Sequence, residues 1–376
     1  MLKKISLRRL SQAFFLGLIL YLAYAHQKYG IEKAASIDAY CPFGLVEGFL
    51  TYLVSGAFLK RLFVSTFILG GIVFFMTFVF GRFFCSYMCS LGALQEWIRG
   101  LGRKIGIKKD VELPKSIDKY ARYIKYIILL VIVYFSFRVG DLVFRSYDPF
   151  AALSHFGLEF EEKIIGYSLL IFALVTSLFA KGWWCRYFCP MGAFLGIQKK
   201  LSFFKINRDK DTCISCGLCN KVCPANLNIM EADKVKEADC ISCQNCVSDC
   251  PKNSLSSSIG KKVLSRKAFE FSVLSVLALL LVLGISSPYW QTKAQSNVVS
   301  SSGEIDANNI RGSNTLGYLI ELSGIEYSVF QNELGLPDEV DLTMKLKDIG
   351  PTYNVKDNFG NFIETESFRE IVRNFQ

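Results

Sequence analysis

The chain has 376 residues, 51% hydrophobic side chains and a formal net charge of +10. This apolar content is too high for an ordinary soluble protein, so we expect a membrane to be the solvent for much of the chain. The positive charge lies in short segments beside apolar runs, where insertion next to anionic lipid accounts for it. The composition therefore indicates membrane lipid as a partner and excludes nucleic acid.

Five apolar runs predict transmembrane helices, because each comes close to the roughly 20 residues that cross a bilayer and has aromatic flanks. The alternative is that some of them are buried helices of a large soluble protein, which leaves a range of roughly four to six spans. The five runs are Leu10–Ala25, Leu62–Phe80, Tyr123–Phe137, Ile164–Ala180 and Ala268–Ile285.

Lys and Arg residues decide the orientation of these runs. They precede the first run, follow the second and fourth, and precede the fifth, and the positive-inside rule places all four segments in the cytoplasm. We expect the N-terminus to be an uncleaved cytoplasmic anchor, and residues 27–61, 138–163 and 288–376 to lie outside. The apolar segment 43–58, interrupted by Glu47, predicts an interfacial or re-entrant helix.

The membrane part contains an internal repeat. GRFFCSYMCSLGAL at 81–94 reappears as GWWCRYFCPMGAF at 182–194, and CPFGLVEGF at 41–49 is echoed by DPFAALSHF at 148–156. Since each half begins and ends inside, we expect two parallel repeats related by an axis along the membrane normal. Such an axis would bring equivalent segments of the two halves together on each face of the membrane.

The repeated CxxxC phrases form a candidate third redox or metal site on the inner face. If each pair lies on one helix, its two sulfurs share a face, and two pairs can close a four-thiolate site. The alternative is that these are small buried residues at tight helix ends, where Gly92 and Gly192 permit close packing. The candidate residues are Cys85, Cys89, Cys185 and Cys189.

A second candidate site lies on the outer face. Cys41, Asp148 and His155, with Glu47 beside them, would place proton-accepting groups next to an apolar slot, which suits a quinone head group. The alternative is that these side chains only cap helix ends at the interface. The chain has two histidines and no CxxCH phrase, which excludes a c-type haem.

Residues 207–258 form a polar insert that holds eight cysteines in two runs, CISCGLCNKVCP at 213–224 and CISCQNCVSDCP at 240–251. This is the bacterial two-cluster ferredoxin pattern, in which the fourth cysteine of each run ligates the other cluster. Zinc would leave the third and fourth cysteines unexplained, and a reducing cytoplasm disfavours disulfides. The predicted [4Fe–4S] ligands are Cys213, Cys216, Cys219 and Cys250 for the first cluster, and Cys240, Cys243, Cys246 and Cys223 for the second.

A Ser-rich linker, SLSSSIG at 254–260, is expected between the insert and the last apolar run. In the tail, TLGYLIELSG and SVFQNELGLP predict two short helices, each opened by Ser or Thr and closed by Gly. The expected fold is an α-helical integral membrane protein with an inserted α+β ferredoxin domain and a small helical C-terminal domain. The domains would be membrane repeats at 1–110 and 111–206, the ferredoxin at 207–258, a fifth helix at 259–290 and the extracytoplasmic tail at 291–376.

CPFG, the two CxxxC phrases and the doubled cysteine run together resemble the membrane 4Fe–4S polyferredoxin family of the NapH, NosR and CcoG type. The resemblance covers roughly residues 10–290 and implies a multi-pass protein of a prokaryotic cytoplasmic membrane that exchanges electrons with a quinone pool and an extracytoplasmic partner. Ser90 departs from the family phrase CxxxCP, which is kept at Pro190. This sequence contains no flavin region like that of NosR-type members, and the pattern of its tail predicts helices rather than an Ig-like domain.

The sequence contains no phosphate loop, Ser-His-Asp set or nicotinamide fingerprint, which leaves electron transfer. We expect a membrane-bound electron-transfer protein that connects the quinone pool or cytoplasmic donors to a membrane or extracytoplasmic redox partner, within a multi-subunit complex. The expected cofactors are two [4Fe–4S] clusters, with a quinone and a further metal centre at the CxxxC pairs as additional candidates. The alternatives are an assembly or regulatory factor that supplies electrons for maturing a metalloenzyme, and a structural anchor.

Overall fold

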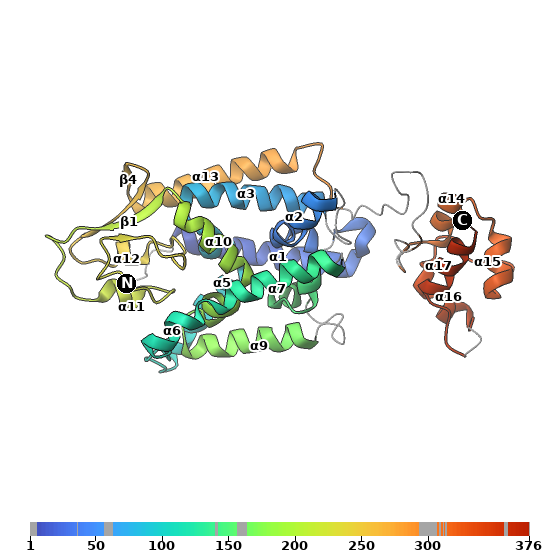
Figure 1. Ribbon diagram of the computed structural model, residues 1–376, viewed down its shortest axis with the longest axis horizontal. Helices are drawn as coiled ribbons and strands as arrows, with labels where there is room; N and C mark the ends of the chain where they lie inside the picture. Colours follow the sequence, from blue (N-terminus) through green and yellow to red (C-terminus); the bar gives the residue numbers. More distant parts are fainter. Residues whose placement is uncertain are drawn as a thin grey trace. The chain divides into compact units, whose positions relative to one another are not determined.

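The chain divides into two compact units, Met1–Ala294 and Gln295–Gln376 (the C-terminal unit) (Figure 1). The first contains the apolar helices with their connections, which we call the helical unit, and the cysteine-rich insert; the second contains a small group of helices. The computed structural model describes residues 6–35, 37–55, 63–139, 142–155, 164–292, 307, 310, 312, 314–356 and 360–375.

All five predicted apolar runs form helices, and Figure 1 shows them extending in roughly the same direction. Within the described part of the chain, two stretches are long and apolar enough to cross a membrane, Ser116–Arg138 and Arg266–Ile285, while two others are shorter apolar helices. The number of spans therefore stays a prediction. The helices are α1 (Leu7–Lys33), α3 (Val64–Phe80), α7 (Ile124–Val139), α9 (Ile164–Phe179) and α13 (Arg266–Ile285).

The same order of elements occurs twice in the helical unit. The first series runs in the order α1, η1 (Ile37–Tyr40), α2 (Phe43–Ser55), α3, α4 (Phe83–Tyr87) and α5 (Ser90–Lys104). Helix α6 (Lys115–Ala121) connects it to the second series. That series runs in the order α7, η2 (Val143–Ser146), α8 (Pro149–Ser154), α9, η3 (Trp184–Phe188) and α10 (Pro190–Leu201).

The two series interlock through reciprocal contacts. Helix α5 of the first series packs on α9 of the second, and α10 of the second packs on α3 of the first. In the same way α2 contacts α7, and α8 contacts α1. Because each series covers the apolar face of the other, neither can bury its core alone.

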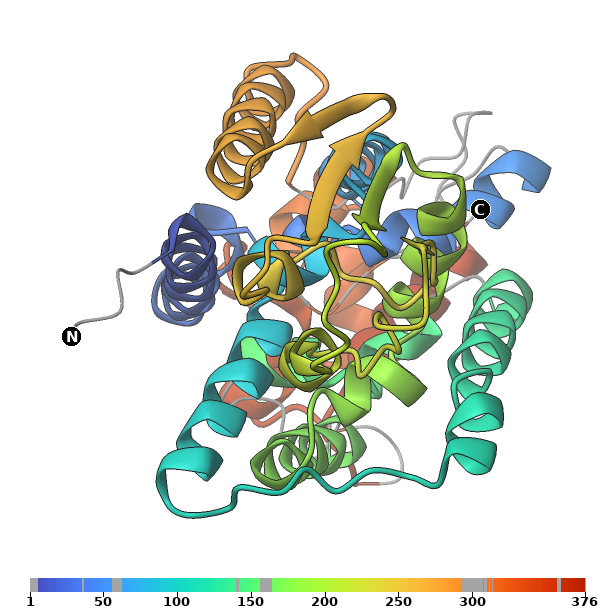
Figure 2. The same ribbon diagram turned by 90° about the vertical axis from the view of Figure 1, so that its left-hand side faces the viewer.

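The insert folds around a four-stranded antiparallel sheet in the order β2-β1-β3-β4, with two short helices. Figure 2 shows it in front of the helices, with α1, α7, α9 and α13 around it. The elements are β1 (Phe204–Arg208), α11 (Leu218–Val222), β2 (Lys234–Val235), α12 (Asn245–Ser248), β3 (Leu255–Ile259) and β4 (Lys262–Leu264).

The prediction of a linker at 254–260 is wrong, because this segment contains the inner strand β3. Strand β3 pairs with β1 on one side and with β4 on the other, so its backbone groups are satisfied within the sheet. The serines do not loosen it, since the Ser257 hydroxyl is buried and donates to the Leu264 carbonyl at 3.0 Å.

The described residues of the C-terminal unit form four helices around a core of their own that includes Leu316, Phe330, Leu346 and Phe368. Helices α14 (Leu316–Ser323) and α15 (Tyr327–Leu334) occupy the two predicted segments and end at left-handed glycines, as expected. The start of α15 differs from the prediction, because it follows Glu326 instead of Ser328. Helices α16 (Leu346–Tyr353) and α17 (Thr365–Asn374) were not predicted.

Candidate functional site

The first set of predicted ligands lines one cavity near the surface of the insert. Cys216 is exposed, and the other three sulfur-bearing residues are partly exposed. Two of them come from the loop before α11, the third lies in α11 itself, and the fourth follows α12, in the second cysteine run. The set that surrounds this cavity is Cys213, Cys216, Cys219 and Cys250.

The second set lines a separate cavity and is fully buried. Three of its four cysteines belong to one core cluster with Met76 and Phe80 of α3 and Phe83 of α4, so this cavity faces the helical unit. The structure brings together both predicted sets, each with three cysteines from one run and one from the other, while ligation itself stays a prediction. The second set is Cys240, Cys243, Cys246 and Cys223.

The two cysteine loops have the same unusual backbone. Ser215 and Gly217 in the first loop have φ of 52° and 70°, and Ser242 and Gln244 in the second both have φ of 57°. Three of these four residues are not glycine, so the left-handed conformation costs free energy that the loop must recover. Successive turns of this kind point backbone N–H groups inward and form the concavities that surround iron–sulfur sites.

The buried thiols of the second set fit a sulfur-ligated cluster. Burial raises the pKa of Cys243 to about 12, and it raises the pKa of Cys246 well above its usual value, with the neighbouring cysteines adding to the effect. Crowded thiolates therefore need a positive partner, which iron provides. In the described part of the chain, no group of three or more His, Cys, Asp or Glu side chains is arranged to hold a single metal ion.

The CxxxC pairs do not lie on single helices, contrary to the first prediction for them. Helix α4 ends at Tyr87 and Cys89 is the N-cap of α5; likewise η3, a π-helical turn, ends before Cys189, the N-cap of α10. Each second sulfur accepts from the backbone N–H of Gly92 or Gly192, at 3.4 and 3.3 Å. The sulfur caps the following helix, and this forces the break.

This break also explains the difference between Ser90 and Pro190. Both residues are the first position of the following helix, where the backbone N–H has no helical partner and proline is favoured. Serine tolerates the same position, so the departure from the family phrase leaves the local fold intact.

The four CxxxC cysteines gather in one buried core between the two series. Arg82 Nη2 donates to Cys85 Sγ at 3.6 Å, and Gln95 Nε2 donates across the repeat to Cys185 Sγ at 3.3 Å. Burial raises the pKa of Cys185 to about 11, with the charge of Cys85 as the next cause. The close packing of the alternative interpretation is also present, since a Cβ on Gly92 would lie 3.0 Å from the Cys85 carbonyl oxygen.

An ion network that sequence reasoning missed joins these phrases to the second cysteine loop. Asp239, next to Cys240, accepts from Arg122 at 2.7 Å, from Arg82 at 3.4 Å and from Lys125. Burial opposes ionisation of Asp239, but the charges of Lys125 and Arg82 hold the pKa of this carboxyl below its usual value. Arg82 lies inside the repeated phrase itself, which was the available signal.

The outer candidate site is only partly assembled. Cys41, Glu47 and Asp148 line one cavity of about 40 Å³, and Asp148 caps α8 by accepting from the Phe150 N–H at 2.9 Å. His155 is not part of its lining; it ends α8, with Nδ1 2.9 Å from the Ala151 carbonyl oxygen. Ligand sites usually exceed about 300 Å³, so this cavity is too small for a quinone ring.

Asp148 is nevertheless chemically distinctive. Burial raises its pKa to about 7, although the backbone N–H groups at the start of α8 oppose this, and the charge of Asp38 adds to the rise. Asp38 is itself paired with Arg145 at 2.8 Å. A carboxyl of this kind exchanges protons near neutral pH.

Comparison with known proteins identifies the two cysteine-bearing regions. A model described as a 4Fe-4S binding domain matches residues 62–108 and 163–208, which include both CxxxC phrases, and a 4Fe-4S dicluster domain matches residues 205–262. No solved structure matches the chain. The fold and the cysteine sets thus define an iron–sulfur electron-transfer protein.

Three relatives illustrate the similarity. The putative electron transport protein YccM of Escherichia coli is 33% identical over 54% of this chain and 57% of its own length. The uncharacterized protein MJ0750 of Methanocaldococcus jannaschii is 30% identical over 59% of this chain and 87% of its own length. The ferredoxin-type protein NapH of Haemophilus influenzae is 30% identical over 54% of this chain and 66% of its own length. The chain belongs to the membrane 4Fe–4S polyferredoxin family.

Proposed function

We propose that the protein is a membrane-bound carrier that connects a quinone pool or cytoplasmic donors to a membrane or extracytoplasmic redox partner through two [4Fe–4S] clusters. Each cluster, when bound, supplies a one-electron redox couple. The observation that carries the proposal is the graded burial of the sulfur sets. The first set reaches the surface at Cys216, the second is buried against the helical unit, and the CxxxC set lies among the helices beyond it.

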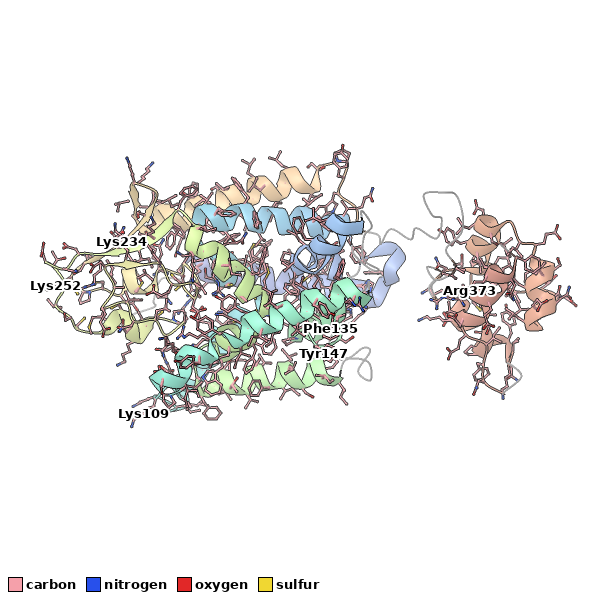
Figure 3. The ribbon with its side chains drawn as sticks, viewed as in Figure 1. Lys109, Phe135, Tyr147, Lys234, Lys252 and Arg373 are labelled. Atoms are coloured by element: carbon pink, nitrogen blue, oxygen red, sulfur yellow. The ribbon has the colours of Figure 1, made fainter. Side chains whose placement is uncertain are left out.

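The surface of the insert supports a soluble donor or acceptor on the cytoplasmic side. Lys252 lines the first cavity, and Figure 3 shows it at the end of the insert that is remote from the helices, with Lys234 also on the insert. Lysines around an exposed redox centre attract a partner with an acidic surface and orient it for transfer. A quinone is a second proposed partner; it would have to bind away from Asp148, where the cavity is too small.

Exposed apolar side chains support the membrane location. In the two stretches long enough to span, only 22% of the residues are buried within the structure. Leu130 of α7 is 71% exposed and Phe271 of α13 is 67% exposed. Apolar surface of this extent is costly in water and favourable in lipid. The Lys and Arg pattern then orients the N-terminus and the insert to the cytoplasm, as expected from the sequence.

The CxxxC set is proposed as a third redox site, either as thiols or as ligands of a further metal centre. Its support is the convergence of four cysteines from both series and the hydrogen bonds to Cys85 and Cys185. These cysteines lie on the side of the helical unit that the second cysteine set contacts, since α4 packs against both.

Iron and acid-labile sulfide per chain, measured without oxygen together with electron paramagnetic resonance of the reduced protein, test the proposal. We expect about 8 iron atoms per chain for two clusters, and clearly more if the CxxxC cysteines also hold iron. In the latter case the double variant Cys85→Ser and Cys185→Ser should return the count to about 8, with Cys41→Ser as the control. A count of about 4 iron atoms or fewer per chain, in protein whose cluster sites are fully loaded, would contradict the two-cluster proposal.

The compact C-terminal unit supports a second candidate, an assembly or regulatory factor. This unit has its own core, which is the usual property of a docking domain. Deletion of the gene would then remove the metal centre of a partner enzyme without reducing bulk electron flow. Loss of electron flow with an intact partner would favour the carrier.

A further inference from the structure

A cavity lies between the CxxxC phrases and the insert, and its lining is strongly cationic. It has a volume of about 350 Å³, with eight Arg and Lys side chains against three carboxylates. Cys85 and Cys185 lie at one part of it, and Pro224, Ala225 and Ile241 of the insert form an apolar wall. Cys89 and Cys189 are not part of the lining, so the cavity adjoins the CxxxC set on the side of its first cysteines only.

Some of the lining cations share one carboxylate. Asp110, which lies outside the lining, contacts three of them: Arg99 at 2.6 Å, Lys181 at 3.0 Å and Arg103 at 3.3 Å. Asp239 is similarly shared by Arg82, Arg122 and Lys125. A surplus of buried positive charge is costly unless a negative group joins it.

Several buried donors beside the cavity have no partner within the described residues. They are Nε of Arg8, Arg82 and Arg186. Arg82 is 1% exposed and Arg186 is 4% exposed, so water cannot freely satisfy these groups. The Nη atoms of these arginines are engaged, those of Arg8 with Glu96 at 2.6 and 2.7 Å, so the Nε–H groups are what remains for a ligand. Charged N–H donors of this kind recognise phosphate and carboxylate oxygens.

We propose that this cavity binds a small organic ligand that carries a phosphate group. The phosphate lies among Arg82, Arg186 and Arg8, and the organic part lies on the wall formed by Pro224, Ala225 and Ile241. A bare phosphate would leave much of about 350 Å³ unfilled, whereas small-molecule sites begin at about this volume. The site does not depend on the electron-transfer proposal, because its charge comes from side chains alone.

Two sources supply this chemistry, a soluble phosphate ester and the head group of an anionic lipid. Arg9, at the start of α1, also lines the cavity and belongs to the segment that the sequence assigns to the cytoplasmic membrane face. The experiment must therefore offer both sources to the same protein.

The test uses the full-length holoprotein, purified without oxygen, and measures its thermal unfolding and ligand binding by calorimetry. AMP is the soluble probe, and nanodiscs with phosphatidylglycerol, compared with phosphatidylcholine alone, are the lipid probe. If only AMP raises the unfolding temperature, the ligand is a soluble phosphate ester. If only phosphatidylglycerol raises it, the ligand is a lipid head group. No response to either probe overturns the proposal.

Variants then locate the binding. Arg82→Gln should weaken binding of the effective probe by at least about tenfold, because it removes a charged hydrogen-bond donor. Gly100→Glu is the second variant: Gly100 lines the cavity with no atom within 4 Å of an added Cβ, so the chain tolerates the carboxylate, which should abolish binding. Gly100→Ala and Lys104→Gln, an exposed change on the same helix, are the controls.

Iron content and the electron paramagnetic resonance spectrum are recorded for every variant. Loss of binding with unchanged iron supports the cavity, and it separates this inference from the electron-transfer proposal. Wild-type binding in both Arg82→Gln and Gly100→Glu would overturn the inference.

Discussion

The guanidinium of Arg82 lies 3.4 Å from the carboxylate of Asp239, and this pair joins the first CxxxC phrase to the residue that precedes Cys240. Both side chains are buried or nearly so, and Arg122 and Lys125 share the same carboxylate. A single acidic side chain therefore holds three cations from the helical unit against the second cysteine loop. The position of this loop relative to the CxxxC set depends on that carboxylate.

Asp239→Asn should therefore destabilise the protein and loosen the second cysteine loop. Removing one partner of a buried charge network typically costs about 3–5 kcal/mol, because the remaining charges are left uncompensated. We expect a lower unfolding temperature and selective loss of the buried cluster, measured by iron content. Asp233→Asn is the matched control in the same insert, since Asp233 is 58% exposed and its ion pairs contribute little. Equal effects of the two substitutions would contradict the role of Asp239.

The crossed arrangement of the cysteine sets predicts which signal each substitution removes. Cys250 belongs to the second run in sequence but lines the first cavity, and Cys223 belongs to the first run but lines the second. Cys250→Ser should therefore perturb the cluster held by Cys213, and Cys223→Ser the cluster held by Cys240. Electron paramagnetic resonance of each variant, compared with Cys216→Ser, measures this. Cys250→Ser should match Cys216→Ser and Cys223→Ser should differ from it. The reverse result, in which Cys223→Ser matches Cys216→Ser and Cys250→Ser does not, would disprove crossed ligation.

The cysteine-rich insert was predictable from sequence because dense ligand spacing reflects the local geometry of a cluster. The strand β3 was not, because its partner β1 is distant in the chain and serine is a weak strand former. The break inside each CxxxC phrase depends on a sulfur that caps a helix, although Pro190 at the first helical position was a usable signal. Helix α16 escaped prediction because Pro351 interrupts its pattern.

The candidate sites likewise contain some residues that the sequence predicted and others that it could not. Cys41 and Asp148 were correctly expected side by side, since the repeat relates their positions. The roles of Gln95 and Asp239 depend on contacts between segments far apart in the chain, which no local pattern reveals, whereas Arg82 was marked by its place in the repeated phrase. His155 was grouped with the outer site by its position in the repeated phrase, yet its ring turns back to the end of α8.

Asp148 predicts a pH dependence of stability. Burial raises its pKa to about 7 in the folded chain, against about 3.9 in an unfolded one, so the folded state holds the proton more tightly. The stabilisation from the neutral carboxyl is complete below about pH 4 and is lost as the pH rises toward about 7. Asp38, Glu47 and Cys41 face the same cavity and add no positive charge, whereas Arg145 is engaged with Asp38.

Asp148→Asn keeps the helix cap, because asparagine caps as well as aspartate, and removes the charge. We expect an unfolding temperature at pH 8 that is higher than wild type by roughly 2–4 °C, and a smaller difference at pH 5. Thermal unfolding of the purified protein across this pH range measures the effect. An unchanged pH slope in the variant would show that Asp148 is already ionised in the folded chain at low pH.

The interlocked packing of α5 on α9 predicts opposite effects for two glycines on the same helix. A Cβ on Gly102 would lie 2.4 Å from the Leu178 carbonyl oxygen of α9, whereas a Cβ on Gly100 meets no atom within 4 Å. Gly102→Ala should push the two helices apart and destabilise the protein by about 1–3 kcal/mol. Gly100→Ala should be neutral or stabilise it by up to about 1 kcal/mol, because alanine favours the helix. Denaturant or thermal unfolding of the two variants and of wild type measures both changes in the free energy of unfolding. If Gly102→Ala left the free energy of unfolding unchanged, α5 and α9 would not be in close contact.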